Sequence, residues 1–307
     1  MKLKKKVILL AGPTASGKSK LAIKLAQHFN GEIINSDSMQ IYKEVSILTS
    51  KPSLEDLKRI KHHLYGSISV KNFFSTGHWL SMAIKKIRDQ WKKGKTPIVV
   101  GGTGLYFKTL IEGLVKIPEI PIKLKNRVRR MHKKIGQEKF YISLIKLDPL
   151  AKKFILKSDT QRTIRAYEVK KFTRKSLFQF TKKTKPNFNK KIFIKIFINT
   201  PKELLHQKIE KRVDNFFEKD VLHEVKNFYK MKVKKEMPAN KIIGMKEITD
   251  FLDGKKTLEQ TKELIKQKTR QYAKRQFTWS RGHMKSWEMI YSPNINDLFK
   301  KAINKIS

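Results

Sequence analysis

Short apolar runs separated by amphipathic segments dominate the first hundred residues of the chain. Residues 6–11 (KVILLA) predict a buried parallel strand, and residues 31–37 (GEIINSD) and 96–100 (TPIVV) predict two more. Between them, residues 19–29 and 74–94 place apolar side chains at helical spacing. This alternation of strands and helices predicts an α/β fold built on a doubly wound parallel sheet.

The pattern changes after Gly113, where two prolines interrupt the chain at Pro118 and Pro121. Residues 122–183 then have a helical pattern that is rich in Lys and Arg, and they contain no clear strand. This stretch predicts a helical insertion rather than a continuation of the sheet.

A second apolar run, residues 191–199 (KIFIKIFIN), predicts that the chain returns to the core sheet. Residues 202–229 and 257–281 follow it with helical spacing and predict C-terminal helices. We therefore expect a core formed by residues 1–112 and 190–307, and a helical insertion domain formed by residues 113–189.

The first predicted strand leads directly into a glycine-rich motif. Residues 12–19 (GPTASGKS) match the phosphate loop G-x-x-x-x-G-K-[ST] and lie between a predicted strand and a predicted helix, as this motif requires. Backbone N–H groups and the helix N-terminus attract an anion there, Lys18 can reach terminal phosphates, and Ser19 can hold Mg²⁺. The alternative is a tight turn without a ligand. The residues expected to bind a polyphosphate are Gly12, Pro13, Thr14, Ala15, Ser16, Gly17, Lys18 and Ser19.

The later predicted strands lack the carboxylate of an ordinary ATPase, in which a strand ends in a magnesium-binding Asp. The strand at 96–100 ends instead in Gly-Gly-Thr-Gly, and the later one ends at Asn199. The early strand-end carboxylate is Asp37, at the edge of the sheet where such folds bind ligands. Asp37 could be linked to a metal, act as a general base, or cap a helix.

Three further groups of residues have a functional and a structural interpretation. Thr103, in the turn GGTGLY, could offer a hydroxyl to a ligand or belong to a simple turn. Arg162 and Arg165 share one helix face and suit phosphate or nucleic acid, or form a solvated basic face. His62 and His63 are consecutive, which favours packing or a hydrogen bond over a metal site.

The charge of the chain favours a polyanionic partner. The sequence has 70 Lys and Arg against 26 Asp and Glu, a formal net charge of +44. Residues 269–281 (TRQYAKRQFTWSR) interleave basic and aromatic side chains, which suits RNA with unstacked bases, or an amphipathic helix whose aromatics are core. A merely solvated, lysine-rich surface is the alternative to a nucleic-acid partner.

Composition excludes several classes of protein. The chain has no Cys, so disulfide scaffolds, thiolate metal sites and Cys nucleophiles are excluded. No apolar run approaches 18 residues, and the N-terminal apolar patch is too short for a signal peptide. We therefore expect no membrane association and a cytoplasmic protein.

Five sequence blocks, in order along nearly the whole chain, together resemble the tRNA dimethylallyltransferase (tRNA isopentenyltransferase) family. They are GPTASGKS, NSDSMQIY, GGTGLY, DTQR with RAYEV, and YAKRQFTWSR. The resemblance implies transfer of a dimethylallyl group from dimethylallyl diphosphate to N6 of the adenosine at tRNA position 37, in tRNAs that read codons beginning with U. It further implies that the phosphate loop holds diphosphate rather than ATP, that Mg²⁺ assists, and that the partner is the anticodon stem-loop. Nothing in the sequence suggests an obligate oligomer, so we expect a monomer.

The resemblance also implies roles for particular residues. Asp37 would be the general base, Thr103 would lie near the reacting base, and Lys18 and Arg212 would stabilise the diphosphate. The positions matched to tRNA contacts are Asp37, Ser38, Met39, Gln40, Thr103, Arg127, Gln161, Arg162, Thr163, Ile164, Arg165, Lys241, Gly244, Lys246, Lys274 and Arg275.

The sequence departs from the family pattern at several positions, which leaves details of the tRNA contacts open. Met245 stands where the family usually has Tyr, and Ser280 stands where it usually has Phe. Two other functions remain open on the residues alone: a P-loop kinase for a small metabolite, and a non-catalytic RNA-binding NTPase.

Overall fold

The computed structural model describes residues 3–181 and 184–306. The chain forms two compact units, one of residues 1–111 with 187–307 and one of residues 112–186. The boundaries expected from the sequence lie within three residues of these. Residues 182–183, at the end of the predicted helical stretch, lie outside the described part.

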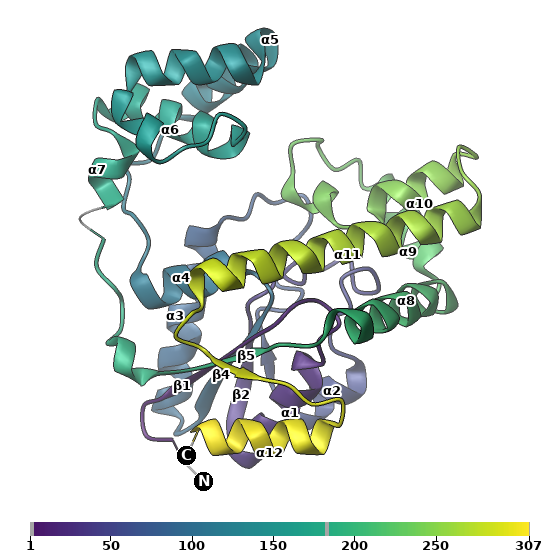
Figure 1. The fold of residues 1–307 in the computed structure, drawn as a ribbon. Coiled ribbons are helices and arrows are strands. Elements are labelled where there is room, and N and C mark those ends of the chain that lie inside the picture. Colours follow the sequence, from purple (N-terminus) through teal and green to yellow (C-terminus); the bar gives the residue numbers. More distant parts are fainter. Residues whose placement is uncertain (1–2, 182–183, 307) are drawn as a thin grey trace. The chain divides into compact units, whose positions relative to one another are not determined.

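A parallel sheet forms the centre of the first unit and confirms the predicted doubly wound α/β fold, which together with the phosphate loop is P-loop NTPase-like. Its strand order is β3-β2-β4-β1-β5-β6, and every neighbouring pair is parallel (Figure 1). Leu10 on the central strand pairs with Val100 on one side and with Ile196 on the other. The strands are β1 (Val7–Ala11), β2 (Gly31–Asn35), β3 (His62–His63), β4 (Thr96–Gly101), β5 (Phe193–Ile198) and β6 (Glu288–Ile290).

Helices cover both faces of this sheet. Every residue of β1 is apolar and successive side chains point to opposite faces, so both faces have apolar side chains that must be buried. Ile8 and Leu10 pack against α1 (Lys18–His28) and α12 (Ile295–Ile306). Leu9 belongs to the larger core on the other face. The helices that contribute to that core are α3 (Thr76–Lys92), α4 (Gly104–Glu112), α8 (Lys202–Glu218), α9 (Val221–Lys230), α10 (Met245–Leu252) and α11 (Leu258–His283).

The single helix predicted over residues 202–229 is wrong, because the chain breaks between α8 and α9. Asp220 has a φ of 57°, in the left-handed region, and its carboxylate accepts a hydrogen bond from His223 N at 3.4 Å. Asp is one of the residues that tolerate this backbone conformation and favour an N-cap. A new helix therefore begins at Val221.

The second unit is helical, as expected, and its described residues contain no strand. It consists of α5 (Ile122–Leu147), α6 (Thr160–Thr173), α7 (Leu177–Thr181) and a 3₁₀ turn at Pro149–Lys153. Gly136, with a φ of 77°, interrupts α5. Leu144 and Ala166 lie in the small core between α5 and α6.

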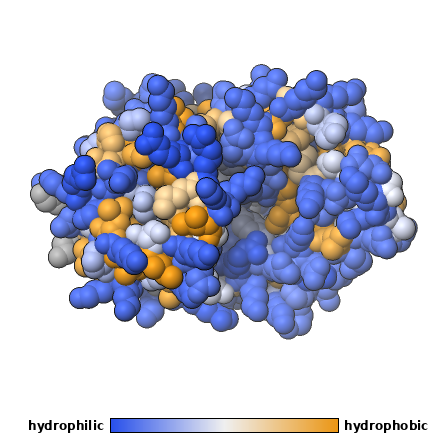
Figure 2. Space-filling model, turned by 90° about the horizontal axis from the view of Figure 1, so that it is seen from above, coloured by the Kyte–Doolittle hydropathy of each residue, from blue (hydrophilic) through white to orange (hydrophobic). Residues whose placement is uncertain are grey.

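Hydrophilic side chains cover most of the face shown in Figure 2, with small hydrophobic patches between them. In the second unit, residues 112–186 include 22 Lys and Arg but only 6 Asp and Glu. In the described part of the chain, no helix combines the length and the apolar character needed to cross a bilayer.

Candidate active site

The phosphate loop joins β1 to α1 at the carboxyl edge of the sheet. Its backbone uses two left-handed positions, Ala15 with φ 62° and Gly17 with φ 88°, which curl the loop at the N-terminus of the helix. A side chain at Gly12 would place its Cβ only 2.7 Å from Ser16 Oγ. Ser16 Oγ is buried and has no hydrogen-bond partner in the described part of the protein. The loop thus presents the curled, polar backbone that an anion requires.

Lys18 lies at the first position of α1, where it is half-buried, and its Nζ donates to Pro13 O at 3.0 Å. Burial lowers the pKa of Lys18 to about 8, while the Asp37 carboxylate opposes that shift and Arg212 adds to it. An anion placed in the loop would favour the charged form of this lysine.

Asp37 lies in the turn after β2, where its Oδ1 accepts from Met39 N at 2.9 Å. The residues that follow form a turn and not an α-helix, so Asp37 closes a local turn rather than capping a helix. Asn35 supports this turn, since its Oδ1 accepts from Asp37 N at 2.8 Å. The carboxylate is thereby fixed at the sheet edge, next to the phosphate loop.

The Gly-Gly-Thr-Gly turn after β4 lies directly against the turn that carries Asp37. Thr103 N donates to Ser36 O at 3.1 Å, and Thr103 Oγ1 accepts from Ser38 N at 3.0 Å. Gly101 allows this approach, because a Cβ there would lie 2.1 Å from Ser36 O. The two strand ends therefore bring Asp37 and Thr103 into one site.

Arg212 reaches the phosphate loop from α8. Its Nη1 donates to Thr14 Oγ1 at 3.0 Å, and its guanidinium lies 5.7 Å from the centre of the Phe216 ring. Burial lowers the pKa of Arg212, and the charge of Asp37 opposes this shift. The four residues predicted to be catalytic, Lys18, Asp37, Thr103 and Arg212, thus come from four different elements of one unit.

Three cavities follow one another through this region. The phosphate-loop cavity, of about 730 Å³, contains the loop, Asp37 and Arg212. A central cavity of about 230 Å³ shares Asp37 and Arg212 with it. An apolar cavity of about 260 Å³ shares Tyr272 and Arg275 with the central one and includes Thr103. The passage formed by these three neighbouring cavities runs from an anion-binding end to an apolar end, and Asp37 lines the first two of them.

One face of α11 forms a wall of this passage. Tyr272, Gln276 and Trp279 recur at helical spacing, and all three line the apolar cavity. Trp279 lies so close to the Gly-Gly-Thr-Gly turn that a Cβ at Gly104 would be 2.1 Å from its ring. The sequence indicated a basic and aromatic helix here, but only the spacing 272, 276 and 279 could have identified the residues that face the site.

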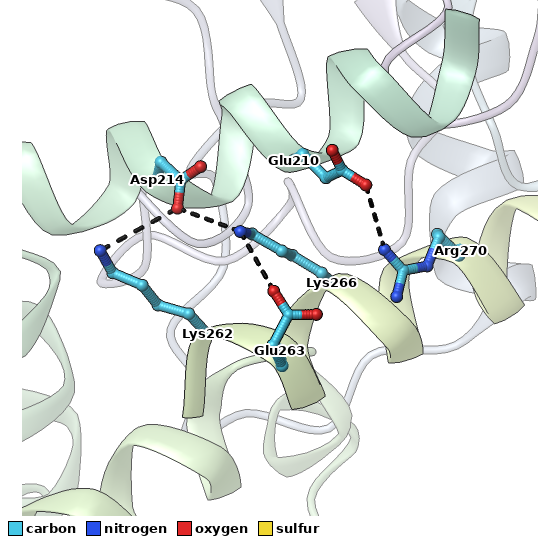
Figure 3. A network of polar contacts seen from close by, with 6 residues as sticks. All are labelled: Glu210, Asp214, Lys262, Glu263, Lys266 and Arg270. Atoms are coloured by element: carbon cyan, nitrogen blue, oxygen red, sulfur yellow. Dashed lines mark hydrogen bonds and ion pairs between the residues drawn. The ribbon is translucent and has the colours of Figure 1, made fainter. Parts of the chain in front are cut away.

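Ion pairs hold α11 beside α8 (Figure 3). Lys266 Nζ lies 3.4 Å from Asp214 Oδ1 and 3.3 Å from Glu263 Oε1, and Arg270 Nη1 lies 3.4 Å from Glu210 Oε1. The pairs Lys266–Asp214 and Arg270–Glu210 connect the helix that carries Arg212 to the helix that carries Tyr272, while Lys266–Glu263 lies within α11. Each pair is partly exposed, so its contribution to stability is about 0–1 kcal/mol.

The predicted RNA contacts of the first unit have different surroundings. Gln40 uses its Nε2 to donate to Thr49 O at 2.8 Å and to Ser50 O at 2.9 Å, which fixes the loop after Asp37. Gly244 is buried and begins α10 with a φ of 96°. The others lie at the cavities or on the surface: Ser38, Met39, Lys241 and Arg275 line the central cavity, and Lys246 and Lys274 are exposed.

In the second unit, Arg162 is exposed, 3.4 Å from the Asp159 carboxylate, and Arg165 lies 3.3 Å from the buried Glu168 carboxylate. Thr163 is fully buried, and its Oγ1 donates to Asp159 O at 2.6 Å, so its side chain supports the helix. The remaining predicted contacts differ in exposure: Arg127 and Gln161 are exposed, and Ile164 is half-buried.

His62 and His63 form the edge strand β3 and make hydrogen bonds, as the sequence indicated. His63 Nε2 lies 2.6 Å from Glu32 Oε2, and His62 Nδ1 lies 2.8 Å from Ile60 O. Both side chains therefore support the sheet edge.

A phosphate loop at the carboxyl edge of a parallel sheet, with a carboxylate and an apolar cavity beside it, defines a P-loop enzyme that acts on a phosphorylated substrate with an apolar group. The family model "IPP transferase" matches residues 40–283. The chain belongs to this family of transferases.

Named relatives agree with this assignment. The chain is 51% identical to the tRNA dimethylallyltransferase of Pelagibacter ubique over 296 residues, which cover 96% of this chain and 95% of the relative. It is 43% identical to the tRNA dimethylallyltransferase of Rickettsia prowazekii over 90% of this chain and 89% of that one.

Solved structures are similar over the same length. A eukaryotic dimethylallyltransferase acting on tRNA matches with a TM-score of 0.84 and 30% identity, covering 98% of this chain and 77% of that chain. The tRNA isopentenylpyrophosphate transferase of Staphylococcus epidermidis matches with a TM-score of 0.68 and 30% identity, covering 98% of both chains.

Proposed function

We propose that this protein transfers the dimethylallyl group of dimethylallyl diphosphate to the exocyclic N6 of adenosine 37 in tRNA, next to the anticodon on its 3′ side. The products are N6-(dimethylallyl)adenosine and diphosphate. The names of the relatives support the reaction. The observation that carries the proposal is the row of neighbouring cavities in which Asp37 lines both the phosphate-loop cavity and the central cavity that adjoins the apolar one.

The donor's diphosphate occupies the phosphate-loop cavity in this proposal. The phosphate-loop residues 14–19, with the Lys18 ammonium, and the Arg212 guanidinium line that space. As the C–O bond of the donor breaks, negative charge collects on the leaving diphosphate, and these fixed positive groups stabilise it. The loop therefore acts on a leaving group, and no strand-end Asp of the ATPase kind is needed.

The residues present are suited to Mg²⁺. Ser19 and Asp37 both line the phosphate-loop cavity and offer oxygen atoms, the ligand type that this ion prefers. No group of three or more His, Asp or Glu side chains surrounds a metal position in the described part of the chain. Ser19 would therefore hold an ion that takes most of its ligands from diphosphate and water, and the ion would neutralise charge on the leaving group.

Asp37 is the general base in this proposal. The N6 amine attacks C1 of the donor, the C1–O bond breaks, and the amine's proton passes to the Asp37 carboxylate. Its turn holds the carboxylate through Met39 N, so it does not have to reorganise during the reaction. Thr103, whose Oγ1 accepts a hydrogen bond from Ser38 N, lines the adjoining apolar cavity and can position the adenine.

The RNA partner is the anticodon stem-loop. Adenosine 37 has to leave its stack to enter the passage, as in other enzymes that modify a base. Each unit supplies polar or basic side chains for the phosphate backbone: Lys274 and Arg275 on α11, and Arg127, Gln161 and Arg162 in the helical insertion.

We further propose that the protein works as a cytoplasmic monomer.

The test is incubation of the protein with dimethylallyl diphosphate labelled in its prenyl group, with and without an anticodon stem-loop RNA that carries adenosine at position 37. We expect label in the RNA, and none when guanosine replaces that adenosine. A parallel reaction with γ-labelled ATP measures kinase activity. Phosphate transfer from ATP without prenyl transfer would contradict the proposal and favour a P-loop kinase.

A further inference from the structure

Gln276 of α11 bonds simultaneously to two loops of the site. Its Oε1 accepts a hydrogen bond from Thr14 N in the phosphate loop at 2.9 Å. Its Nε2 donates to Gly102 O in the Gly-Gly-Thr-Gly turn at 3.0 Å. A carboxamide is suited to this bridge, because it carries an acceptor and a donor on one planar group.

The surrounding backbone leaves little freedom for this amide. A Cβ at residue 102 would lie 2.1 Å from Gln276 Nε2, so the bridge exists only because that residue is Gly. Gln276 also lines the apolar cavity, next to Tyr272 and Trp279. The side chain is therefore part of the wall of the passage as well as a link between loops.

Thr14 is held from two helices. Gln276 on α11 accepts from its N–H, and Arg212 on α8 donates to its Oγ1. The ion pair between Lys266 and Asp214 also joins these two helices. Thr14 thus fixes the phosphate loop to α11, the helix that also lines the apolar cavity.

We propose that Gln276 is a positioning residue, which sets the distance between the phosphate loop and the turn that carries Thr103 and so aligns the donor with the adenosine. This inference rests on the proposed function. Gln276 touches Thr14 and Gly102 and acts through them on both substrates. A displacement of about 1 Å between reacting groups can reduce turnover by about 10²-fold.

The experiment compares Gln276→Met, which removes both hydrogen bonds, with Gln276→Glu, which keeps an acceptor for Thr14 N but cannot donate to Gly102 O. Gln267→Met is the matched control, since Gln267 is exposed on the same helix. The measurements are kcat and KM for prenyl transfer, affinity for stem-loop RNA, affinity for inorganic diphosphate, and the melting temperature.

For Gln276→Met we expect a fall in kcat of about 10²-fold, weaker binding of diphosphate, and RNA affinity within about threefold of the wild type. Gln276→Glu keeps the acceptor for Thr14 N but adds a negative charge beside the phosphate loop, so it should bind diphosphate more weakly than the wild type and also lose kcat. A kcat of either variant within threefold of the wild type, or an equal loss in Gln267→Met, would overturn the proposal.

Two outcomes separate this inference from its premises. If the wild type transfers no prenyl group, the proposed function fails, while the diphosphate measurement still tests the link from Gln276 to the phosphate loop. If Gln276→Met does not fold, Gln276→Glu decides, because a folded variant with wild-type kcat contradicts the positioning role.

Discussion

Arg212 on α8 donates a hydrogen bond from Nη1 to Thr14 Oγ1, 3.0 Å away in the phosphate loop. Arg212 lies 198 positions after Thr14 in the sequence. It nevertheless becomes part of the anion-binding site that the phosphate loop forms. The planar guanidinium can keep this bond with one nitrogen and offer others to a diphosphate.

Arg212→Lys should therefore retain the positive charge but lose the planar set of N–H donors that can bind Thr14 and diphosphate together. We expect KM for dimethylallyl diphosphate to rise and kcat to fall by about tenfold or more, because the leaving diphosphate loses a directed donor. Steady-state kinetics measure both constants. Arg59→Lys, a surface change on α2 (Leu54–Arg59), is the control; an unchanged kcat/KM in Arg212→Lys would contradict the role.

Asp37→Asn removes the proton acceptor and preserves the shape of the side chain. We expect turnover to fall by about 10²-fold or more, with RNA affinity nearly unchanged, since a general base contributes about 10²–10⁴-fold. Single-turnover transfer and a binding titration separate the two effects. Asp253→Asn, at the end of α10, is the control; full activity of Asp37→Asn would exclude Asp37 as the base.

The pKa of Lys18, lowered by burial to about 8, predicts that diphosphate binding depends on pH. The lysine is charged below pH 8 and loses its proton above it, so affinity should be constant at lower pH and about tenfold weaker by pH 9. Calorimetric titration with diphosphate measures this change. In Lys18→Arg the side chain stays charged, so the decline should be smaller; identical pH profiles for both proteins would refute the prediction.

Glu224 on α9 stabilises the loop that follows Tyr42. Its carboxylate accepts hydrogen bonds from Ser46 N at 2.5 Å, Ile47 N at 2.8 Å and Leu48 N at 3.0 Å. Removing it in Glu224→Ala leaves three N–H groups without an acceptor, and we expect the free energy of unfolding to fall by about 2 kcal/mol. Urea denaturation tests this, with Glu218→Ala as the control; equal losses in the two variants would show that the three bonds contribute little.

Arg162→Ala should weaken RNA binding without changing KM for the donor. Each phosphate contact releases counterions, so the slope of log affinity against log salt should become shallower by about 1. Binding titrations between about 50 and 200 mM salt measure the slope. Lys301→Ala on α12, which removes the same charge, is the control; the same slope change there would mean that the effect comes from net charge alone.

The sequence predicted the local parts of the site well. The phosphate loop, Asp37 and Thr103 all lie at strand ends, and a strand followed by a Gly-rich turn can be recognised within a few residues. The same holds for the parallel sheet, although β3 and β6 are two and three residues long and too short to leave a periodic signal.

The features that the sequence did not predict depend on contacts between segments that are far apart along the chain. Gln276 is separated from Gly102 by 174 positions, and nothing near either residue indicates that they meet. The complete burial of Thr163 likewise depends on how α6 packs and has no signal in the neighbouring sequence. The break between α8 and α9 is also missing from the sequence pattern. It depends on the backbone conformation of one residue, Asp220, and the helical spacing of apolar residues continues across it.

The close approach of Gly102 and Gly104 to α11 has an evolutionary consequence. With a Cβ at either position only 2.1 Å from Gln276 or Trp279, the turn and the helix cannot change independently. A larger residue in the turn would require a smaller one on the helix, so the two segments should covary among related chains. Chimaeras that exchange α11 between distant homologues should lose activity unless the turn is exchanged with it.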